Sequence, residues 1–286
     1  MPIQNIWTSK EYYISIINGS SGDDTLNGTS KDDEIIGSAG NDTIFGHQGN
    51  DTLIGGQGDD SLHGGLGNDS LRSGFGEDLL YGNEGNDLFY PSYGSDSIYG
   101  GSGLDQVIYE SVMTQHNLVN ISPAHWKLSE SGYTSTDHLQ DIERVQFVDK
   151  SVALDINTGE VGGSCYRLYK AAFNRSPDHS GLGFWIDQMD MGMQLSEVSS
   201  RFIDSHEFKV LYGDSPSNNI FLTNVYTNVL GREPDSGGFN WWLAELENNV
   251  TKTWTKVLMD FSESPENREG VLALIGNGVE YDIWIA

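Results

Sequence analysis

Apolar and polar positions repeat with a period of nine residues over about a third of the chain. From Gly19 to Ile108 the sequence divides without a gap into ten nonamers. The eighth position is apolar in all ten and the sixth is always aspartate, whereas the fourth is glycine in all but the second nonamer, which has Lys31. A glycine-rich linker would not keep such a register, so the pattern indicates a repeated structural unit.

The residue types predict the shape of each unit. Six glycine-rich residues can turn through positive-φ conformations that other residues adopt only at a cost. Three extended residues follow, and only the middle one points inward. Stacked nonamers then form two parallel sheets around a thin aliphatic core. Each turn lies above the turn two nonamers earlier, about 4.8 Å away. We therefore expect a parallel β-roll over residues 19–108.

This stacking brings aspartates of alternate turns together. Residues 19–108 hold 16 acidic and two basic residues, a net charge of -14. Like charges at this spacing are unfavourable unless a cation lies between them. Carboxylates and backbone carbonyls form a hard-oxygen cage that suits Ca²⁺. Pairing turns i and i+2 predicts up to eight ions, with side-chain ligands from Asp24, Asp33, Asp42, Asp51, Asp60, Asp69, Asp78, Asp87, Asp96 and Asp105.

The nonamers resemble the RTX (hemolysin-type) calcium-binding repeats, whose consensus is G-G-x-G-x-D-x-U-x. The resemblance implies a β-roll, calcium binding, and export by type I secretion machinery through an uncleaved C-terminal signal. It also implies carbonyl ligands in the turns, at Ser20, Gly22, Ser38, Gly40, His47, Gly49, Gly56, Gly58, Gly65, Gly67, Gly74, Gly76, Asn83, Gly85 and Gly94. Lys31 departs from the consensus. We expect it to adopt positive φ, to add a cation and to weaken its site.

Other segments should close the ends of the roll, because the terminal coils would otherwise expose core and strand edges. Residues 1–18 are expected to form an N-terminal cap strand, with the strand at 12–17. Residues 109–162 are expected to form a β capping segment, with strands at 126–130 and 145–148. The sequence around 141–155 resembles the segment that closes many RTX rolls.

Residues 163–286 show helical spacing and predict an all-α domain of about eight helices in two related halves. The fold class is thus a multidomain β + α chain. The helical segment resembles a domain of unknown function that often ends secreted RTX proteins and is similar to phycobilisome linker domains. Its halves share Arg-x-Pro-Asp-x-x-Gly at Arg175 and Arg232. These arginines either bind an anion or sugar or stabilise a turn, and we favour the turn.

Composition narrows the possible functions. The net charge of -27 works against binding to nucleic acid or anionic lipid. No run of eighteen apolar residues predicts a membrane span, and no secretory signal peptide is recognisable at the N-terminus. The protein is therefore either cytosolic or exported without an N-terminal signal. Cys165 is the only cysteine, so an intrachain disulfide is not possible.

Enzymatic motifs are not recognisable. His206-Glu207 lacks the second histidine of a zinc protease helix, and no Gly-x-Ser-x-Gly or phosphate-binding loop occurs. We therefore expect no catalytic residues. The predicted function is a secreted calcium-binding extracellular or cell-surface protein, acting in adhesion, in a matrix or in polysaccharide binding. The alternative is a folding and secretion module, or a non-catalytic subunit of a secreted enzyme or toxin.

Two surface features remain open at this stage. Ninth-position residues of odd nonamers should form an outward row that contains Phe45, His63, Tyr81 and Tyr99. This row either binds a sugar or packs against another part of the protein, and we favour packing. The segment 281–286 resembles the tail of some type I secretion substrates, and a frayed helical end is the alternative.

Overall fold

The computed structural model describes residues 15–283, which form two compact units. The first unit holds the described residues up to Asp105 together with the short segment Ser135–His138. The second holds residues 106–134 and 139–283. Of the predicted N-terminal cap strand, only Ser15–Asn18 is described, and it forms strand β1. The rest of that prediction lies outside the described residues.

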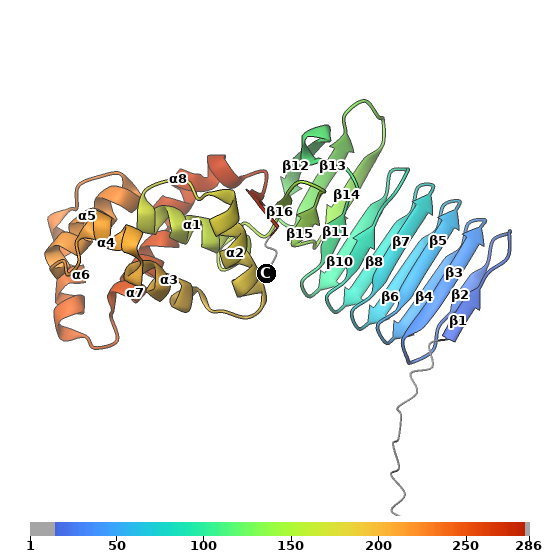
Figure 1. Ribbon diagram of the computed structural model, residues 1–286, viewed down its shortest axis with the longest axis horizontal. Coiled ribbons are helices and arrows are strands. Elements are labelled where there is room, and N and C mark those ends of the chain that lie inside the picture. The colour runs from blue at the N-terminus through green and yellow to red at the C-terminus, as the bar shows by residue number, and fades with distance from the viewer. Residues whose placement is uncertain (1–14, 284–286) are drawn as a thin grey trace, which may run out of the picture. The chain divides into compact units, whose positions relative to one another are not determined.

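The first unit is the predicted parallel β-roll (Figure 1). Its strands form two parallel layers, and successive strands alternate between them. One layer contains β1 (Ser15–Asn18), β3 (Asp33–Ala39), β5 (Thr52–Gln57), β7 (Ser70–Phe75) and β9 (Leu88–Tyr90). The other contains β2 (Thr25–Asn27), β4 (Thr43–Gln48), β6 (Ser61–Leu66), β8 (Leu79–Glu84) and β10 (Ser97–Ser102).

The strand register equals two nonamers. Ile35 pairs with Ile17 on one side and with Leu53 on the other, so each residue stacks on the one 18 positions away. The eighth-position side chains form the core and have no solvent exposure at Ile35, Ile44, Leu53, Leu62, Leu71, Leu80, Phe89 and Ile98. One buried apolar side chain per nine ordered residues is a small hydrophobic contribution, so the roll needs another source of stability.

The strands of the second unit form two sets. Strand β11 (Gln106–Ile108) pairs in parallel with β15 (Arg144–Gln146), which pairs antiparallel with β16 (Ser151–Ala153). A short 3₁₀ helix (Met113–Gln115) precedes the hairpin of β12 (His116–Ser122) and β13 (His125–Glu130). Strand β14 (Thr136–Gln140) begins in the first unit. The predicted strands at 126–130 and 145–148 correspond to β13 and β15.

The chain end is not wholly helical. Strand β17 (Val279–Tyr281) pairs antiparallel with β16, so the segment predicted as all-α contains one strand. Tyr281 is almost completely buried, which contradicts a frayed helical end at that residue. The rest of the proposed export tail is Asp282 and Ile283, without regular structure, and residues 284–286, which lie outside the described part of the chain.

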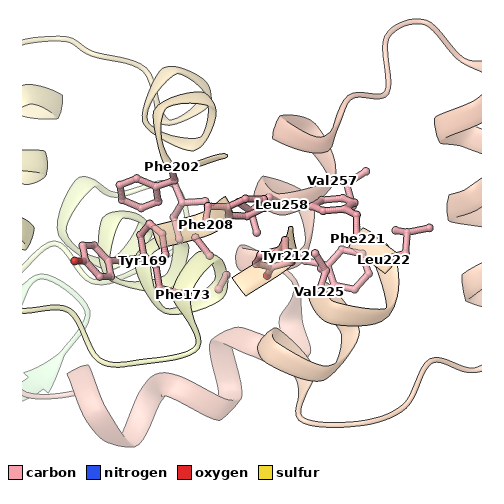
Figure 2. Close-up of a cluster of buried hydrophobic side chains, with 14 of the residues drawn as sticks. Tyr169, Phe173, Phe202, Phe208, Tyr212, Phe221, Leu222, Val225, Val257 and Leu258 are labelled. Atoms are coloured by element: carbon pink, nitrogen blue, oxygen red, sulfur yellow. The ribbon is translucent and has the colours of Figure 1, made fainter. Parts of the chain in front are cut away.

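Eight α-helices lie within the described residues, as the periodicity predicts. They are α1 (Val161–Phe173), α2 (His179–Asp190), α3 (Leu195–Asp204), α4 (His206–Tyr212), α5 (Asn218–Leu230), α6 (Ser236–Asn248), α7 (Trp254–Ser262) and α8 (Pro265–Ile275). Figure 2 shows their shared core, in which Phe202, Phe208 and Phe221 lie among aliphatic side chains such as Leu258. Ser264 caps the N-terminus of α8, and Pro265 occupies its first helical position.

The Arg-x-Pro-Asp-x-x-Gly turns have the structural role that we favoured. Asp178 and Asp235 cap α2 and α6, because each carboxylate accepts a hydrogen bond from the backbone N–H of the residue three positions later. Arg175 makes a two-bond ion pair with Glu207 at 2.7 and 3.0 Å. Arg232 makes the matching pair with Glu266 at 2.8 and 3.1 Å. The guanidinium groups therefore connect each turn to a later helix of the same half.

Candidate metal centre

The sixth-position aspartates stack in two columns, one for odd and one for even nonamers. In each column a carboxylate Oδ1 accepts the backbone N–H of the aspartate 18 residues earlier, at 2.7–3.1 Å. The structure thus brings together the eight predicted pairs, which are Asp24–Asp42, Asp42–Asp60, Asp60–Asp78, Asp78–Asp96, Asp33–Asp51, Asp51–Asp69, Asp69–Asp87 and Asp87–Asp105.

The second carboxylate oxygen is buried without a partner along the middle of both columns. Within residues 15–283, no hydrogen-bond donor reaches Oδ2 of Asp42, Asp51, Asp60, Asp69, Asp78 or Asp87. These side chains are at most 2% exposed. An unpaired buried carboxylate oxygen is strongly unfavourable, so each of these atoms indicates a missing cation or proton.

The aspartate pKa values agree with this interpretation. Burial, the largest cause, raises the pKa of Asp51, Asp60, Asp69 and Asp87 to about 6. Burial, followed by the nearby charge of Asp137, raises the pKa of Asp96 to about 7. The columns therefore favour binding of a positive charge near neutral pH.

First-position glycines make room for these carboxylates. A Cβ added to Gly46, Gly55 or Gly64 would collide with Oδ2 of the aspartate five residues later. Sequence reasoning assigned this glycine only to turn flexibility, whereas the structure shows that its missing side chain leaves space for the carboxylate. Any ion held at Oδ2 would occupy the same crowded region of the turn.

The predicted carbonyl ligands lie in the stacked turns. Fourth-position glycines from Gly40 onward adopt positive φ, and a Cβ on Gly58 would collide with the carbonyl oxygen of Gly40. Second-position residues are packed as closely as the fourth-position glycines, because a Cβ on Gly56 would collide with the carbonyl oxygen of Ser38. These carbonyls therefore point along the columns, toward the next turn. Ser20 and Gly22, in the first nonamer, lie outside this positive-φ pattern.

The donors present fit Ca²⁺. Among the described residues, no three His, Cys, Asp or Glu side chains converge on one point, as a side-chain metal cluster would require. The available donors are instead paired carboxylates and backbone carbonyls, which are hard oxygen ligands. Arg72, one of the two basic residues of the nonamers, lies 4.0 Å from the centre of the Tyr90 ring. It therefore does not act as counter-ion to the columns.

Comparison with known families decides the identity of these turns. The family model described as RTX calcium-binding nonapeptide repeat (4 copies) matches residues 18–53, 54–89 and 81–111. Residues 18–111 are RTX calcium-binding repeats. The description Domain of unknown function (DUF4214) matches residues 165–211 and 199–271, within the helices. The search of curated proteins found no match to the chain.

The RTX repeats bind calcium, and the aspartate columns are where their carboxylates meet. Bound there, Ca²⁺ would neutralise the buried carboxylates, while the carbonyls of the turns would complete its shell. The number of ions and the individual ligands stay predictions. No helix among residues 15–283 is long and apolar enough to cross a membrane.

The expectation for Lys31 is wrong in one respect. Lys31 is not among the residues with positive φ, so it does not strain its turn. Its backbone N–H donates to the Thr29 hydroxyl at 3.2 Å, and Thr29 itself bonds to Asp33. The second RTX turn has a different conformation from the later turns, which is why lysine is accommodated there.

A second column of stacked hydrogen bonds, outside the carboxylate columns, was not predicted from the sequence. At the fifth position, an Asp or Asn Oδ1 accepts the backbone N–H of the residue 18 positions later, at 2.7–3.0 Å. The acceptors are Asp23, Asp32, Asn41, Asn50, Asp59, Asn68 and Asn86. The frequent Asp or Asn before the sixth-position aspartate was the available signal.

An eleventh aspartate continues the odd column from outside the repeats. Asp137 Oδ1 accepts the N–H of Asp96 at 3.0 Å, and the His138 N–H donates to the Asp96 carbonyl at 2.8 Å. Asp96 and Asp78 are joined by the same two bonds within the RTX repeats. Asp137 and His138 thus occupy the place of a further repeat in the column, although 41 residues separate Asp137 from Asp96.

The predicted ligand row lies on the outer face of β4, β6, β8 and β10, on the strands and not in the turns. Neighbouring rings of Phe45, His63, Tyr81 and Tyr99 are 4.7–4.8 Å apart and nearly parallel. All four side chains are partly exposed. The structure therefore forms the row that the nonamer register predicts, at a distance from the calcium columns.

Proposed function

We propose that this protein is a secreted, non-enzymatic RTX protein that acts outside the cell or at its surface and binds polysaccharide. RTX repeat proteins are typically secreted, and calcium at extracellular concentrations would keep the roll folded. The observation that carries the proposal is the partly exposed row of four stacked rings. Regular aromatic spacing along a rigid sheet suits a polymer with a regular repeat.

The geometry of the row limits the mode of contact. Because neighbouring rings face one another, a ligand meets mainly their edges and not their open faces. Two residues earlier on the same strands lie the partly exposed hydroxyl groups of Thr43, Ser61 and Ser97, with Leu79 between the two serines. The Ser61 hydroxyl also bonds to the His63 ring at 3.0 Å. The surface thus combines apolar ring edges with hydroxyl donors and acceptors, which matches the two faces of a sugar ring.

In the helices, the two arginines considered for a ligand site have other partners. Arg175 and Arg232 are the residues for which an anion or sugar site was considered, and both are held in ion pairs with glutamates. The charge of -27 favours a neutral glycan over nucleic acid as partner. We propose adhesion or matrix attachment as the process that this binding serves.

The test of glycan binding is the double substitution Tyr81→Ala with Tyr99→Ala. The matched control is Phe75→Ala with Tyr93→Ala, a stacked pair 5.2 Å apart outside the row, whose side chains are 57% and 66% exposed. Binding to a glycan array in Ca²⁺ should fall at least tenfold for the first variant only, with circular dichroism unchanged in both. If the first variant loses stability and shows no binding difference, the row is an interface.

The test of export is a deletion of the last sixty residues. We propose that type I machinery recognises the C-terminal region, so the truncated protein should remain in the cell. Its RTX repeats should still bind calcium, because the carboxylate columns end at Asp105 and Asp137. Normal export of this truncation would contradict a C-terminal signal.

A further inference from the structure

The first nine RTX turns belong to two conformational classes. In the third to eighth turns the second-position residue has positive φ, as at Ser38 (90°), His47 (80°) and Asn83 (79°). These same six turns carry the aspartates whose buried Oδ2 lacks a hydrogen-bond donor. We call them open turns. The first, second and ninth turns lack positive φ at the second position, and we call them closed turns.

Backbone N–H and hydroxyl groups satisfy Oδ2 of the aspartates in the first two closed turns. The Ser20 N–H and hydroxyl donate to Asp24 Oδ2 at 2.6 and 2.9 Å. The Thr29 N–H and hydroxyl donate to Asp33 Oδ2 at 2.5 and 2.9 Å. Two donors on one oxygen replace what a cation would supply. The Ser20 N–H and then its hydroxyl lower the pKa of Asp24.

In the ninth turn, the hydroxyl group that bonds to the aspartate comes from the seventh turn. Ser73 stands where the consensus has glycine, and its hydroxyl donates to Asp96 Oδ2 at 3.3 Å. The Ser73 oxygen in turn accepts the N–H of Ser92 at 3.2 Å. Ser73 is fully buried, so water does not compete for this bond. Oδ2 of a third aspartate therefore accepts a hydrogen bond from a residue that departs from the repeat pattern.

We propose that Ser20, Thr29 and Ser73 restrict calcium loading to the interior of the roll. Ca²⁺ binds tightly at pairs in which both turns are open, which are Asp42–Asp60, Asp60–Asp78, Asp51–Asp69 and Asp69–Asp87. The pairs Asp24–Asp42, Asp33–Asp51 and Asp78–Asp96 each contain a closed turn and bind at least tenfold more weakly. This inference rests on calcium binding by the repeats and is independent of the glycan face.

The difference in affinity follows from the charges that each pair buries. At an open pair, Ca²⁺ removes the cost of two desolvated carboxylate oxygens. At a closed pair, one oxygen already has donors, and the ion must displace them before it can bind. The closed turns lie at the first two positions and near the end of the stack. At these places hydrogen bonds hold the ends of the roll together without an ion.

The test counts tightly bound calcium in the full-length protein by isothermal titration calorimetry and native mass spectrometry. Three of the eight aspartate pairs contain a closed turn. Four pairs join two open turns, and the remaining pair, Asp87–Asp105, reaches the tenth turn, where Gly101 also has positive φ. The unaltered protein should therefore bind at most five ions tightly. Thr29→Gly and Ser73→Gly should each add one tight ion, and the double variant two. The matched control Ser38→Gly makes the same type of change at the second position of an open turn, and should add none.

Thr29→Val provides a second variant that keeps the branched shape and the backbone N–H while removing the hydroxyl. It should strengthen the weak site at least threefold, with the dichroism spectrum in Ca²⁺ unchanged. Eight equivalent tight ions in the unaltered protein would overturn the proposal. So would an unchanged ion count in Thr29→Gly and Ser73→Gly, or an equal gain in Ser38→Gly.

Discussion

The sixth-position aspartates of the open turns use their two carboxylate oxygens differently. Oδ1 accepts a backbone N–H from the preceding turn of its column, which fixes the spacing of the stack. Oδ2 is turned over the first-position glycine, where the open turns offer it no donor. One side chain thus supplies a structural hydrogen bond and a free ligand oxygen, so its loss would affect both stacking and calcium binding.

The raised aspartate pKa values predict an unusual dependence of stability on pH. Asp51, Asp60, Asp69 and Asp87 have a folded-state pKa of about 6, against an ordinary value of 3.8. Their protonated forms therefore favour the folded state, and this stabilisation is complete below pH 3.8 and lost as pH rises through 6. Calcium-stripped protein should gain β-sheet dichroism and resistance to urea as pH falls from 7 to 5.

Saturating calcium should reverse this dependence, because the ion requires deprotonated carboxylates. Urea unfolding between pH 4 and 8, with and without Ca²⁺, measures both trends. A calcium-stripped roll that loses stability on acidification over this range would show that the carboxylate columns do not control it.

The space above first-position glycines can be tested by adding one methyl group. Gly55→Ala places a Cβ against Oδ2 of Asp60 and the carbonyl of Ser73, whereas a Cβ at Gly22 meets no atom within 4 Å. Gly55→Ala should reduce the free energy of unfolding in Ca²⁺ by about 1–3 kcal/mol, a typical cost of overpacking. Gly22→Ala should cost less than about 0.5 kcal/mol. Equal effects of the two substitutions would contradict the packing role.

At the scale of elements, the second unit depends on a buried arginine. Arg144 in β15 bonds to Asp155 at 2.6 Å and to both carboxylate oxygens of Asp190 at 2.5 and 2.9 Å. Asp155 also accepts the N–H groups of Val161 and Gly162 at the start of α1. A single side chain therefore connects a strand to the beginning of one helix and the end of another.

Replacing this arginine should strongly destabilise the second unit. Arg144→Met leaves two carboxylates without their counter-ion, and breaking a buried pair in this way costs about 3–5 kcal/mol. The control is Arg201→Met, which removes an exposed pair with Glu197 and should cost at most about 1 kcal/mol. Thermal unfolding followed by the helical signal at 222 nm compares the two. Similar midpoints for both variants would show that the buried pair contributes little.

At the scale of the whole molecule, the two units differ in how they are stabilised. The roll buries one apolar side chain per nonamer and carries most of its charge as carboxylates. The helices of the second unit share an extended core of aromatic and aliphatic side chains, including Phe208, Phe221 and Leu258 (Figure 2). No calcium ligand is predicted among its helices. Metal dependence should therefore be confined to the roll.

Chelation should separate the two units in one experiment. Removing calcium at pH 7 should reduce the β-sheet dichroism to the share of the second unit's strands and leave the helical signal at 222 nm nearly intact. The sheet signal should return when Ca²⁺ is added at around 10⁻⁴–10⁻³ M, the usual extracellular range. Mg²⁺ at the same concentration serves as the control, since it demands stricter octahedral geometry. A sheet signal that the chelator does not diminish would contradict calcium-dependent folding.

The sequence by itself determined every feature that follows from strict repetition. A fixed period places each residue over its equivalent 18 positions away, so the aspartate columns, the aliphatic core and the aromatic row all follow from one register. Helical spacing likewise determined the eight helices and their internal duplication. Glu207 and Glu266, partners of Arg175 and Arg232, occupy equivalent positions in the two halves, which is why the turn interpretation held.

Only the tertiary structure decided the features that depend on contacts without a period. Asp137 enters the odd column after a non-repeating segment whose length gives no register, and β17 returns to β16 from beyond the last helix. The difference between open and closed turns depends on which donor reaches Oδ2, and the Ser73 hydroxyl reaches Asp96 from another turn. Such contacts are set by side-chain packing over distances of a few ångströms, which a linear pattern does not encode.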